Sequence, residues 1–135
     1  MHIGWKETHA TGIEEIDGLQ LELFRVAAQL VESARAQHAP EARAHVARLS
    51  ELAKVLFEEE ERTLREADVH SLERHASEHL RFLADLAGFS RELGRRGHEA
   101  LADLRLARHI AAWLEAHVGR TDRDLNRARK LQLGS

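Results

Sequence analysis

Polar side chains that can bind metal occupy positions where the helical pattern of the sequence calls for apolar residues. They are Gln20 on the first apolar stripe, Glu60 on the second, His75 and His79 on the third, and His117 on the fourth. Polar groups buried without partners are costly. A divalent cation offsets that cost, because neutral imidazole nitrogens and carboxylates are its ordinary ligands. The pattern predicts metal binding more strongly than a polar core without function.

The same residues are expected at one height in the fold. With turns near residues 39, 68 and 96, Gln20 and Glu60 each lie about 20 residues from the first turn, and Glu60 and His75 about 7 or 8 from the second. His75 and His117 each lie about 21 residues from the third turn. Neighbouring helices are expected to be antiparallel, so equal distances from a turn mean equal heights. We expect these four residues in one core layer, with His79 one turn from His75.

Asp122 is a further candidate whose orientation the spacing does not decide. It follows His117 by five residues, about 140° around an ideal helix, so both side chains cannot face inward from a straight helix. Gly119 lies between them and could loosen or end the helix, which would let Asp122 turn back. Both outcomes stay open on spacing alone.

The other histidines and several charged or aromatic residues have simpler interpretations. The histidines fall near termini, near turns or off the stripes and are interpreted as surface residues: His2, His9, His38, His45, His70, His98 and His109. The glutamates beside Glu60 are interpreted as a solvated acidic face: Glu58, Glu59 and Glu61. Trp5 and Trp113 are interpreted as packing residues.

Four amphipathic segments must position these side chains. Apolar residues recur in steps of three and four over about 12–38, 40–66, 71–94 and 98–118, which predicts four helices. Their lengths and short connections predict an all-α, up-down-up-down antiparallel four-helix bundle. The domain is expected to cover residues 1–135, with a short C-terminal extension after Gly119 that could form an extra helix capped by Thr121.

Local signals mark the expected helix ends. Thr11 and Glu14 form a capping-box pattern before the first helix, and Pro40 suits the first turn of the second. The segment from Asp68 to Ser71 offers N-cap residues between the second and third helices. Two glycines, Gly94 and Gly97, are expected to end the third helix.

Composition narrows the class of protein. The chain has 135 residues, 43% hydrophobic and 32% charged, with a net charge of −3 and no cysteine. This fits one domain, excludes disulfides and thiolate metal sites, and gives no reason to expect nucleic acid as a partner. No apolar run approaches the roughly 20 residues that span a bilayer, and the first residues lack a signal-peptide pattern. We therefore expect a cytoplasmic protein with no membrane partner.

Four motifs in order resemble those of the hemerythrin family, bacteriohemerythrins included, over nearly the whole chain. The motifs are Trp5 with Gly12-Ile13 and Ile16-Asp17; Leu56-Phe57 with Glu60-Glu61 and Leu64; His75-x3-His79-x2-Phe82-Leu83; and Trp113-Leu114-x2-His117-Val118-x3-Asp122. Each motif alone is a weak signal. Their order and spacing make the resemblance specific.

The resemblance implies a two-iron site, which many members use to bind O2 reversibly. It assigns the three histidines of the third and fourth helices to one iron, and Glu60 and Asp122 to the bridging carboxylates. The two histidine positions of the other iron hold Gln20 and Leu56 here. Leucine cannot ligate, and a neutral amide oxygen is a poor ligand beside imidazole. The departure affects O2 carriage, because the resemblance places O2 at the iron that has lost its histidines.

The leading hypothesis is a mononuclear site on the three histidines, completed by Glu60 and Asp122. The resemblance favours non-haem iron, one per chain, with zinc, manganese and cobalt as alternatives for mixed nitrogen and oxygen ligands. Gln20 and Leu56 would line the vacated second metal position, open to water, O2 or NO. The expected role is binding or sensing O2, NO or reactive oxygen species.

Two further hypotheses stand beside it. One is a diiron O2 binder or carrier with an altered second site, and the other is a structural or partner-binding bundle with a vestigial site. No acid–base pair or substrate pocket can be identified in the sequence, so a non-enzymatic role is favoured over an enzyme. The physiological protein partner is not indicated.

Overall fold

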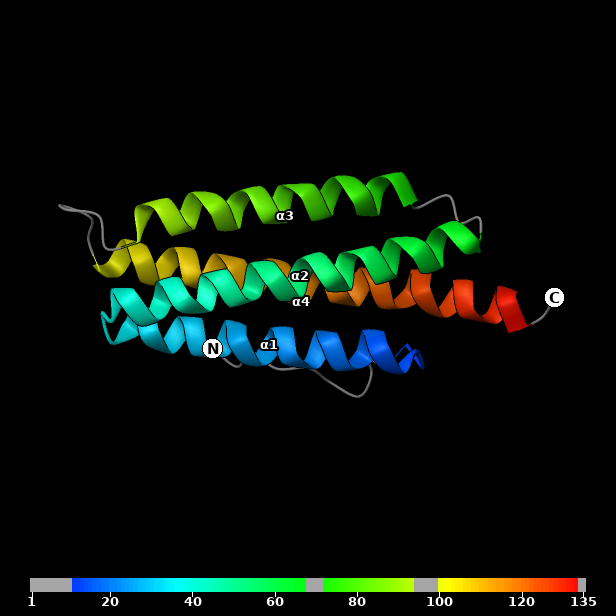
Figure 1. Ribbon diagram of the computed structural model, residues 1–135, viewed down its shortest axis with the longest axis horizontal. Helices are drawn as coiled ribbons and strands as arrows, with labels where there is room; N and C mark the ends of the chain where they lie inside the picture. Colours follow the sequence, from blue (N-terminus) through cyan, green and yellow to red (C-terminus); the bar gives the residue numbers. More distant parts are fainter. Residues whose placement is uncertain (1–10, 68–71, 94–99, 134–135) are drawn as a thin grey trace.

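Four helices make up the molecule, as the periodicity predicts. The computed structural model describes residues 11–67, 72–93 and 100–133, and these contain no strand. The helices are α1 (Glu14–Arg35), α2 (Ala39–Glu66), α3 (Leu72–Glu92) and α4 (Ala100–Leu133). They lie alongside one another along the long axis of the molecule (Figure 1). α1 packs mainly on α2 and α4, and α3 packs on α2 and α4.

The apolar stripes face one another and form a single core. Leu23 and Leu30 of α1, Leu49 and Leu64 of α2 and Phe82 of α3 are each at most 1% exposed. On α4 the core continues beyond the expected helix, through residues 125 and 128. Burial of these stripes supplies the main stabilisation of the fold.

The first helix starts differently from the capping-box prediction. Its N-cap is Ile13, which makes no side-chain cap hydrogen bond. Thr11 donates from both its backbone N–H and its hydroxyl to Asp17 Oδ1, at 2.8 Å each, and Gly12 N–H donates to Asp17 Oδ2 at 3.1 Å. Gly12 has a φ of 82°, which suits glycine. Asp17 of the first turn therefore takes the role expected of Glu14, because its carboxylate accepts several donors at once.

The connection between α1 and α2 is a Schellman turn. The N–H of Gln37 donates to the carbonyl of Ala34 at 3.2 Å, and the N–H of His38 donates to that of Ser33 at 3.0 Å. Gln37 has a φ of 61°, the left-handed conformation that this turn requires. The midpoint of the turn is residue 37, and Pro40 lies in the first turn of α2 as predicted.

The fourth helix is longer than expected and contains no break at Gly119. It runs unbroken from Ala100 to Leu133, so the predicted end near residue 118 and the separate short extension are wrong. A Cβ added at Gly119 would meet no atom within 4 Å. Gly119 therefore serves no close approach, and buried Leu125 and Ala128 pack the continuing helix onto the core.

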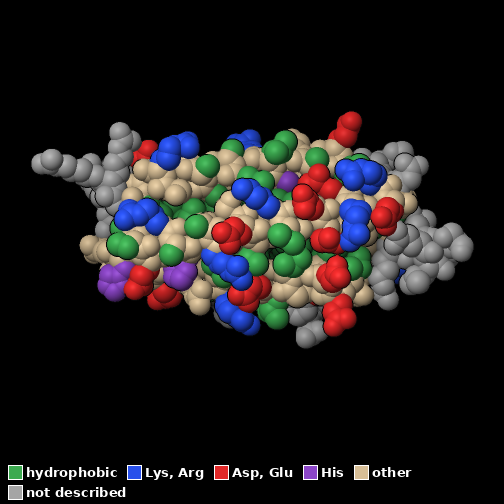
Figure 2. Space-filling view, in the orientation of Figure 1, with side chains coloured by type: hydrophobic (Ala, Val, Ile, Leu, Met, Phe, Trp, Pro, Cys, Tyr) green, Lys and Arg blue, Asp and Glu red, His purple; other side chains and the backbone are tan. Residues whose placement is uncertain are grey.

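Several predictions concern residues outside the described part of the chain. Trp5, His2, His9, His70 and His98 lie there, as do the segment 68–71 and both glycines expected to end the third helix. Within the described residues, no helix is long and apolar enough to cross a membrane. Figure 2 shows acidic and basic side chains interspersed over one face, without a large area of a single charge.

Candidate metal centre

The structure brings together the three histidines that the sequence singles out. His75 and His79 lie on α3 and His117 on α4, and all are at most 1% exposed. One nitrogen of each lies within 4.8 Å of the other two, an arrangement that could hold a metal ion. The i, i+4 spacing places His75 and His79 on the same face of α3, and His117 faces them across the core.

The inner ring atoms of the cluster converge with one carboxylate and one hydroxyl. His79 Nε2 lies 3.1 Å from His117 Nε2. Glu60 Oε1 lies 3.1 Å from His79 Nε2 and 3.5 Å from His117 Nε2. The Thr121 hydroxyl lies 3.1 Å from His117 Nε2 and 3.4 Å from His75 Nδ1. These contacts make a compact polar cluster inside an apolar core.

The spacing of three of these atoms suits a single metal ion. Two nitrogens each about 2.1 Å from one metal are about 3.0 Å apart at a right angle and about 3.4 Å apart at a tetrahedral angle. The distances among His79 Nε2, His117 Nε2 and Glu60 Oε1 are 3.1, 3.1 and 3.5 Å. A point about 2.1 Å from all three lies just off their plane. These three donor atoms therefore fit a single metal ion.

The surroundings of Glu60 also favour a cation at this site. It is 0% exposed, and neither carboxylate oxygen makes a hydrogen bond of normal geometry within the described residues. Its contacts with His79 and His117 are therefore electrostatic pairings. A buried carboxylate in that state is costly unless a cation accompanies it. This observation adds to the geometric fit.

Each histidine of the cluster also contacts a separate carboxylate through its outer ring nitrogen. His79 Nδ1 lies 2.7 Å from Glu61 Oε2 on α2. His117 Nδ1 lies 3.0 Å from Glu78 Oε2 on α3. These pairs match the carboxylate–histidine arrangement that orients metal-ligating imidazoles in proteins.

The third outer contact involves the opposite ring nitrogen. His75 Nε2 lies 2.8 Å from Asp124 Oδ2 on α4, and Arg74 donates to the same oxygen at 2.8 Å. The cluster is thus enclosed by three carboxylates, each partly accessible to solvent.

Aromatic side chains hold two of the imidazole planes. Phe57 of α2 stacks on His79 with ring centroids 3.8 Å apart and an interplanar angle of 2°. Trp113 of α4 stacks on His117 with ring centroids 4.6 Å apart and an interplanar angle of 10°. Phe82 of α3 in turn stacks on Trp113, with ring centroids 4.4 Å apart. Trp113 is therefore a packing residue, as predicted, and what it packs against includes the site.

Burial and the neighbouring charged groups shift the pKa values of the buried site residues in opposite directions. Burial raises the pKa of Glu60, but the nearby His117 and His79 outweigh it and lower that pKa to about 2. Burial lowers the pKa of His79, yet Glu60 and Glu61 together raise it above its ordinary value. Burial also lowers the pKa of His75, and Asp124 does not reverse this. The Glu60 carboxylate and the His79 imidazolium thus favour each other's charged forms, whereas burial favours the neutral form of His75.

Gln20 and Leu56, which the sequence predicts to line the vacated second metal position, are both buried. They are 0% and 1% exposed. Both side-chain amide atoms of Gln20 lack a hydrogen-bond partner within the described residues. Because the first turn centres on residue 37 and not 39, Gln20 lies 17 residues from it, Leu56 19 and Glu60 23. The expected common layer is therefore wrong for Gln20, whose height matches Leu56 and differs from that of Glu60 by about 9 Å of helix rise.

Sequence reasoning missed four residues of the site. Glu61 is not simply part of a solvated face, since it pairs with His79. Glu78, Asp124 and Thr121 were not considered as site residues at all. Thr121 could have been found from the i+4 spacing to His117 had the helix been continued past residue 119. The side chain of Asp122, the predicted fifth ligand, lies outside the described residues.

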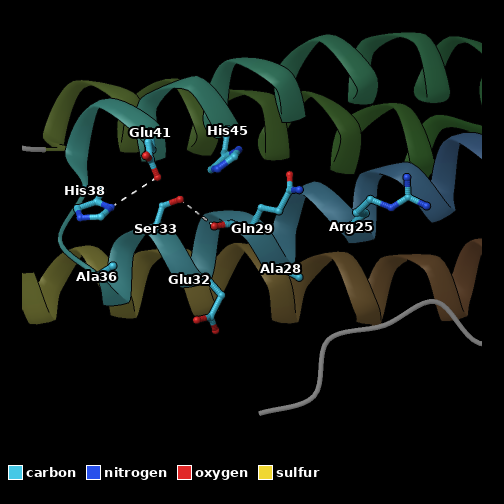
Figure 3. Close-up of a pocket in the computed structure, with 9 residues that line it drawn as sticks. All are labelled: Arg25, Ala28, Gln29, Glu32, Ser33, Ala36, His38, Glu41 and His45. Carbon is cyan, nitrogen blue, oxygen red and sulfur yellow. Dashed lines mark hydrogen bonds and ion pairs between the residues drawn. The ribbon is translucent and has the colours of Figure 1, made fainter.

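The histidines predicted to be on the surface include two that line a different hollow. It has a volume of about 620 Å³, lies between α1 and α2, and contains His38, Glu41 and His45 (Figure 3). His38 and Glu41 are well exposed, 3.6 Å apart. Among the described residues, no three groups there are close enough to hold a metal. The hollow is about 22 Å along α2 from Glu60, judged by 15 residues of helix rise from His45.

A second groove reaches the histidine cluster. It has a volume of about 320 Å³, lies between α2 and α3, and is lined by Phe57, Glu61, His79 and the 71% exposed Leu80, among others. The groove connects the solvent with the outer edge of His79.

Comparison of the chain with protein-family models, with curated proteins and with solved structures finds no match.

Proposed function

We propose that this protein binds one divalent metal ion at the buried cluster of His75, His79 and His117, with Glu60 as an oxygen ligand. The observation that carries the proposal is the orientation of the histidines. One ring nitrogen of each histidine lies within 4.8 Å of a nitrogen of the other two, while another ring nitrogen of each meets its own carboxylate. A polar core needing only satisfied hydrogen bonds has no reason to point three imidazoles at one another.

The residues of the chain have separate roles in this proposal. Glu60 supplies negative charge where the metal charge would lie, and His79 must be neutral at the nitrogen that would bind the metal. Phe57 and Trp113 keep the imidazole planes in place and exclude water. The bound metal would supply Lewis acidity, and one-electron redox chemistry if it is iron.

The occupant that the resemblance to hemerythrins favours is non-haem iron, and the fold would be the family's up-down-up-down antiparallel bundle. Zinc, manganese and cobalt also suit the donor set. Asp122 is proposed as a further oxygen ligand on the resemblance alone. The role proposed on the same ground is binding or sensing O2, NO or reactive oxygen species in the cytoplasm.

Gln20 and Leu56 support one metal per chain in preference to two. Leu56 offers no ligand atom, and the buried amide of Gln20 is a weak ligand. A diiron carrier would need its second ion to be held almost entirely by bridging carboxylates and water. The unpartnered amide of Gln20 supports a smaller occupant at that height, such as water or another small exogenous ligand.

The experiment is metal content per chain, measured by elemental analysis on untagged protein purified without added metal and again after reconstitution with ferrous iron or zinc. We expect one metal per chain in wild type and less than a tenth of that in His75→Ala. The matched control is His109→Ala, which removes an exposed histidine of α4 and should leave metal content unchanged.

The outcomes separate the three hypotheses. Two irons per chain would refute the mononuclear proposal and support the diiron hypothesis. No metal after reconstitution, with a melting temperature unmoved by iron or zinc, would leave a structural bundle with a vestigial site.

A further inference from the structure

The three histidines do not present the same ring nitrogen to the centre. The inner atom of His79 is Nε2, which lies 3.1 Å from both His117 Nε2 and Glu60 Oε1. The inner atom of His117 is likewise Nε2. His75 turns the other way, with Nδ1 toward the Thr121 hydroxyl at 3.4 Å and Nε2 toward Asp124 at 2.8 Å.

The outer carboxylates fix which nitrogen carries the proton. An ionised carboxylate only accepts hydrogen bonds, so the ring nitrogen facing it must be the N–H. Asp124 therefore requires Nε2–H on His75, which leaves the lone pair on Nδ1. Glu61 and Glu78 require Nδ1–H on His79 and His117, so in the neutral form of each ring the lone pair lies on Nε2.

Arg74 fixes the orientation of the Asp124 carboxylate that contacts His75. Its guanidinium donates to the same Asp124 oxygen that meets His75 Nε2, at 2.8 Å. A donor on that oxygen orients the carboxylate. Asp124 lies seven residues after His117 on α4, on the part of the helix beyond Gly119. The unbroken fourth helix is thus what brings this carboxylate to His75.

We infer that Asp124 is a positioning residue that holds His75 as its Nε2–H tautomer, so that the centre is built from one Nδ1 and two Nε2 donors. The inference rests on the proposed metal site and adds to it a mixed donor set that neither the histidine spacing nor the resemblance indicates. It depends on a residue outside the histidine motifs.

The test is long-range ¹H–¹⁵N NMR of the histidine rings at about pH 8, above the ordinary imidazole pKa, in metal-free and zinc-loaded protein. A protonated ring nitrogen and one with a free lone pair have well-separated ¹⁵N shifts. We expect His75 to be protonated at Nε2 in both states, with zinc shifting its Nδ1. We expect zinc to shift Nε2 of His79 and His117.

Variants at Asp124 separate positioning from general support of the fold. Asp124→Ala should leave His75 as a mixture of tautomers and weaken zinc binding about 10–100-fold. Asp124→Asn should restore the Nε2–H tautomer, because Arg74 holds the amide oxygen toward His75, with affinity between the two. Asp85→Asn, which changes an exposed carboxylate of α3, is the matched control and should alter neither readout.

His75 protonated at Nδ1 in the zinc-loaded protein would overturn the inference, and so would an unchanged single tautomer in Asp124→Ala. If zinc does not bind at all, the proposed function fails. The tautomer of His75 in the metal-free protein and its response to Asp124→Ala would still decide the inference on their own.

Discussion

Replacing Gln20 by leucine should stabilise the metal-free protein. Gln20 is 0% exposed, and both its amide oxygen and its amide nitrogen lack a hydrogen-bond partner within the described residues. Each buried unpaired polar group costs about 1–3 kcal/mol. Leucine has a similar volume and no polar atom, so the substitution removes the cost without leaving a cavity.

The expected gain is about 2 kcal/mol, toward the lower end of the cost of two unpaired groups, because the packing at the new side chain is not optimised. For a chain of this size that is a rise in melting temperature of about 6 °C. Urea unfolding followed by circular dichroism measures the free energy of unfolding, and an unchanged m-value would show that the transition is still comparable. Gln29→Leu is the matched control: Gln29 lies on the exposed face of the same helix, and its substitution should change stability by less than about 0.5 kcal/mol.

A loss of about 1 kcal/mol or more in Gln20→Leu would refute the reasoning. It would mean that the amide is paired in solution, by water or by a small ligand at the height of Leu56. The same measurement after zinc loading would then show whether that partner belongs to the metal centre.

Three further predictions follow from the site and from α4. Gly119→Ala should stabilise the protein by about 0.5–1 kcal/mol, because a Cβ there meets nothing within 4 Å and alanine is the better helix former; destabilisation would mean that the helix does break at this residue. Thr121→Val should cost about 1 kcal/mol in metal-free protein through the lost hydroxyl contacts with His75 and His117, and urea unfolding should show a smaller loss with zinc bound; an equal loss in both states would argue against zinc on those nitrogens. Glu60 and Glu61 raise the pKa of His79 above the ordinary imidazole value of 6.5. Because zinc must displace that proton, the zinc affinity should keep rising as the pH increases above 6.5. Calorimetric titrations in a pH series measure this, and an affinity that is flat above 6.5 would contradict the raised pKa.

The pKa shifts also set the pH dependence of folding. Glu60 has a lower pKa when folded than when unfolded, so its pairing contributes stability that is present above about pH 4.5 and is lost as the pH falls toward 2. His79 has a raised pKa, so its contribution is complete below 6.5 and is lost as the pH rises through its folded value. His75 has a lowered pKa, so it opposes folding below 6.5.

The sequence by itself determined the four helices, their buried faces and the three histidines of the centre. Side chains repeat around a helix every 3.6 residues, so a polar residue on an apolar stripe must enter the core wherever the helices pack. This is why Glu60, His75, His79 and His117 could be identified as buried without any knowledge of the fold. The same reasoning explains the buried amide of Gln20, although its height was misjudged because the first turn centres two residues earlier than expected.

Only the tertiary structure decided which groups meet the outer faces of the imidazoles. Glu61, Glu78 and Asp124 each belong to a different helix from the histidine they contact, and contacts between helices depend on rotation and tilt that the periodicity does not fix. The tertiary structure also decided that α4 continues past Gly119. A glycine costs a helix about 1 kcal/mol, and burial of the apolar side chains beyond it offsets that cost, which brings Thr121 and Asp124 to the histidines.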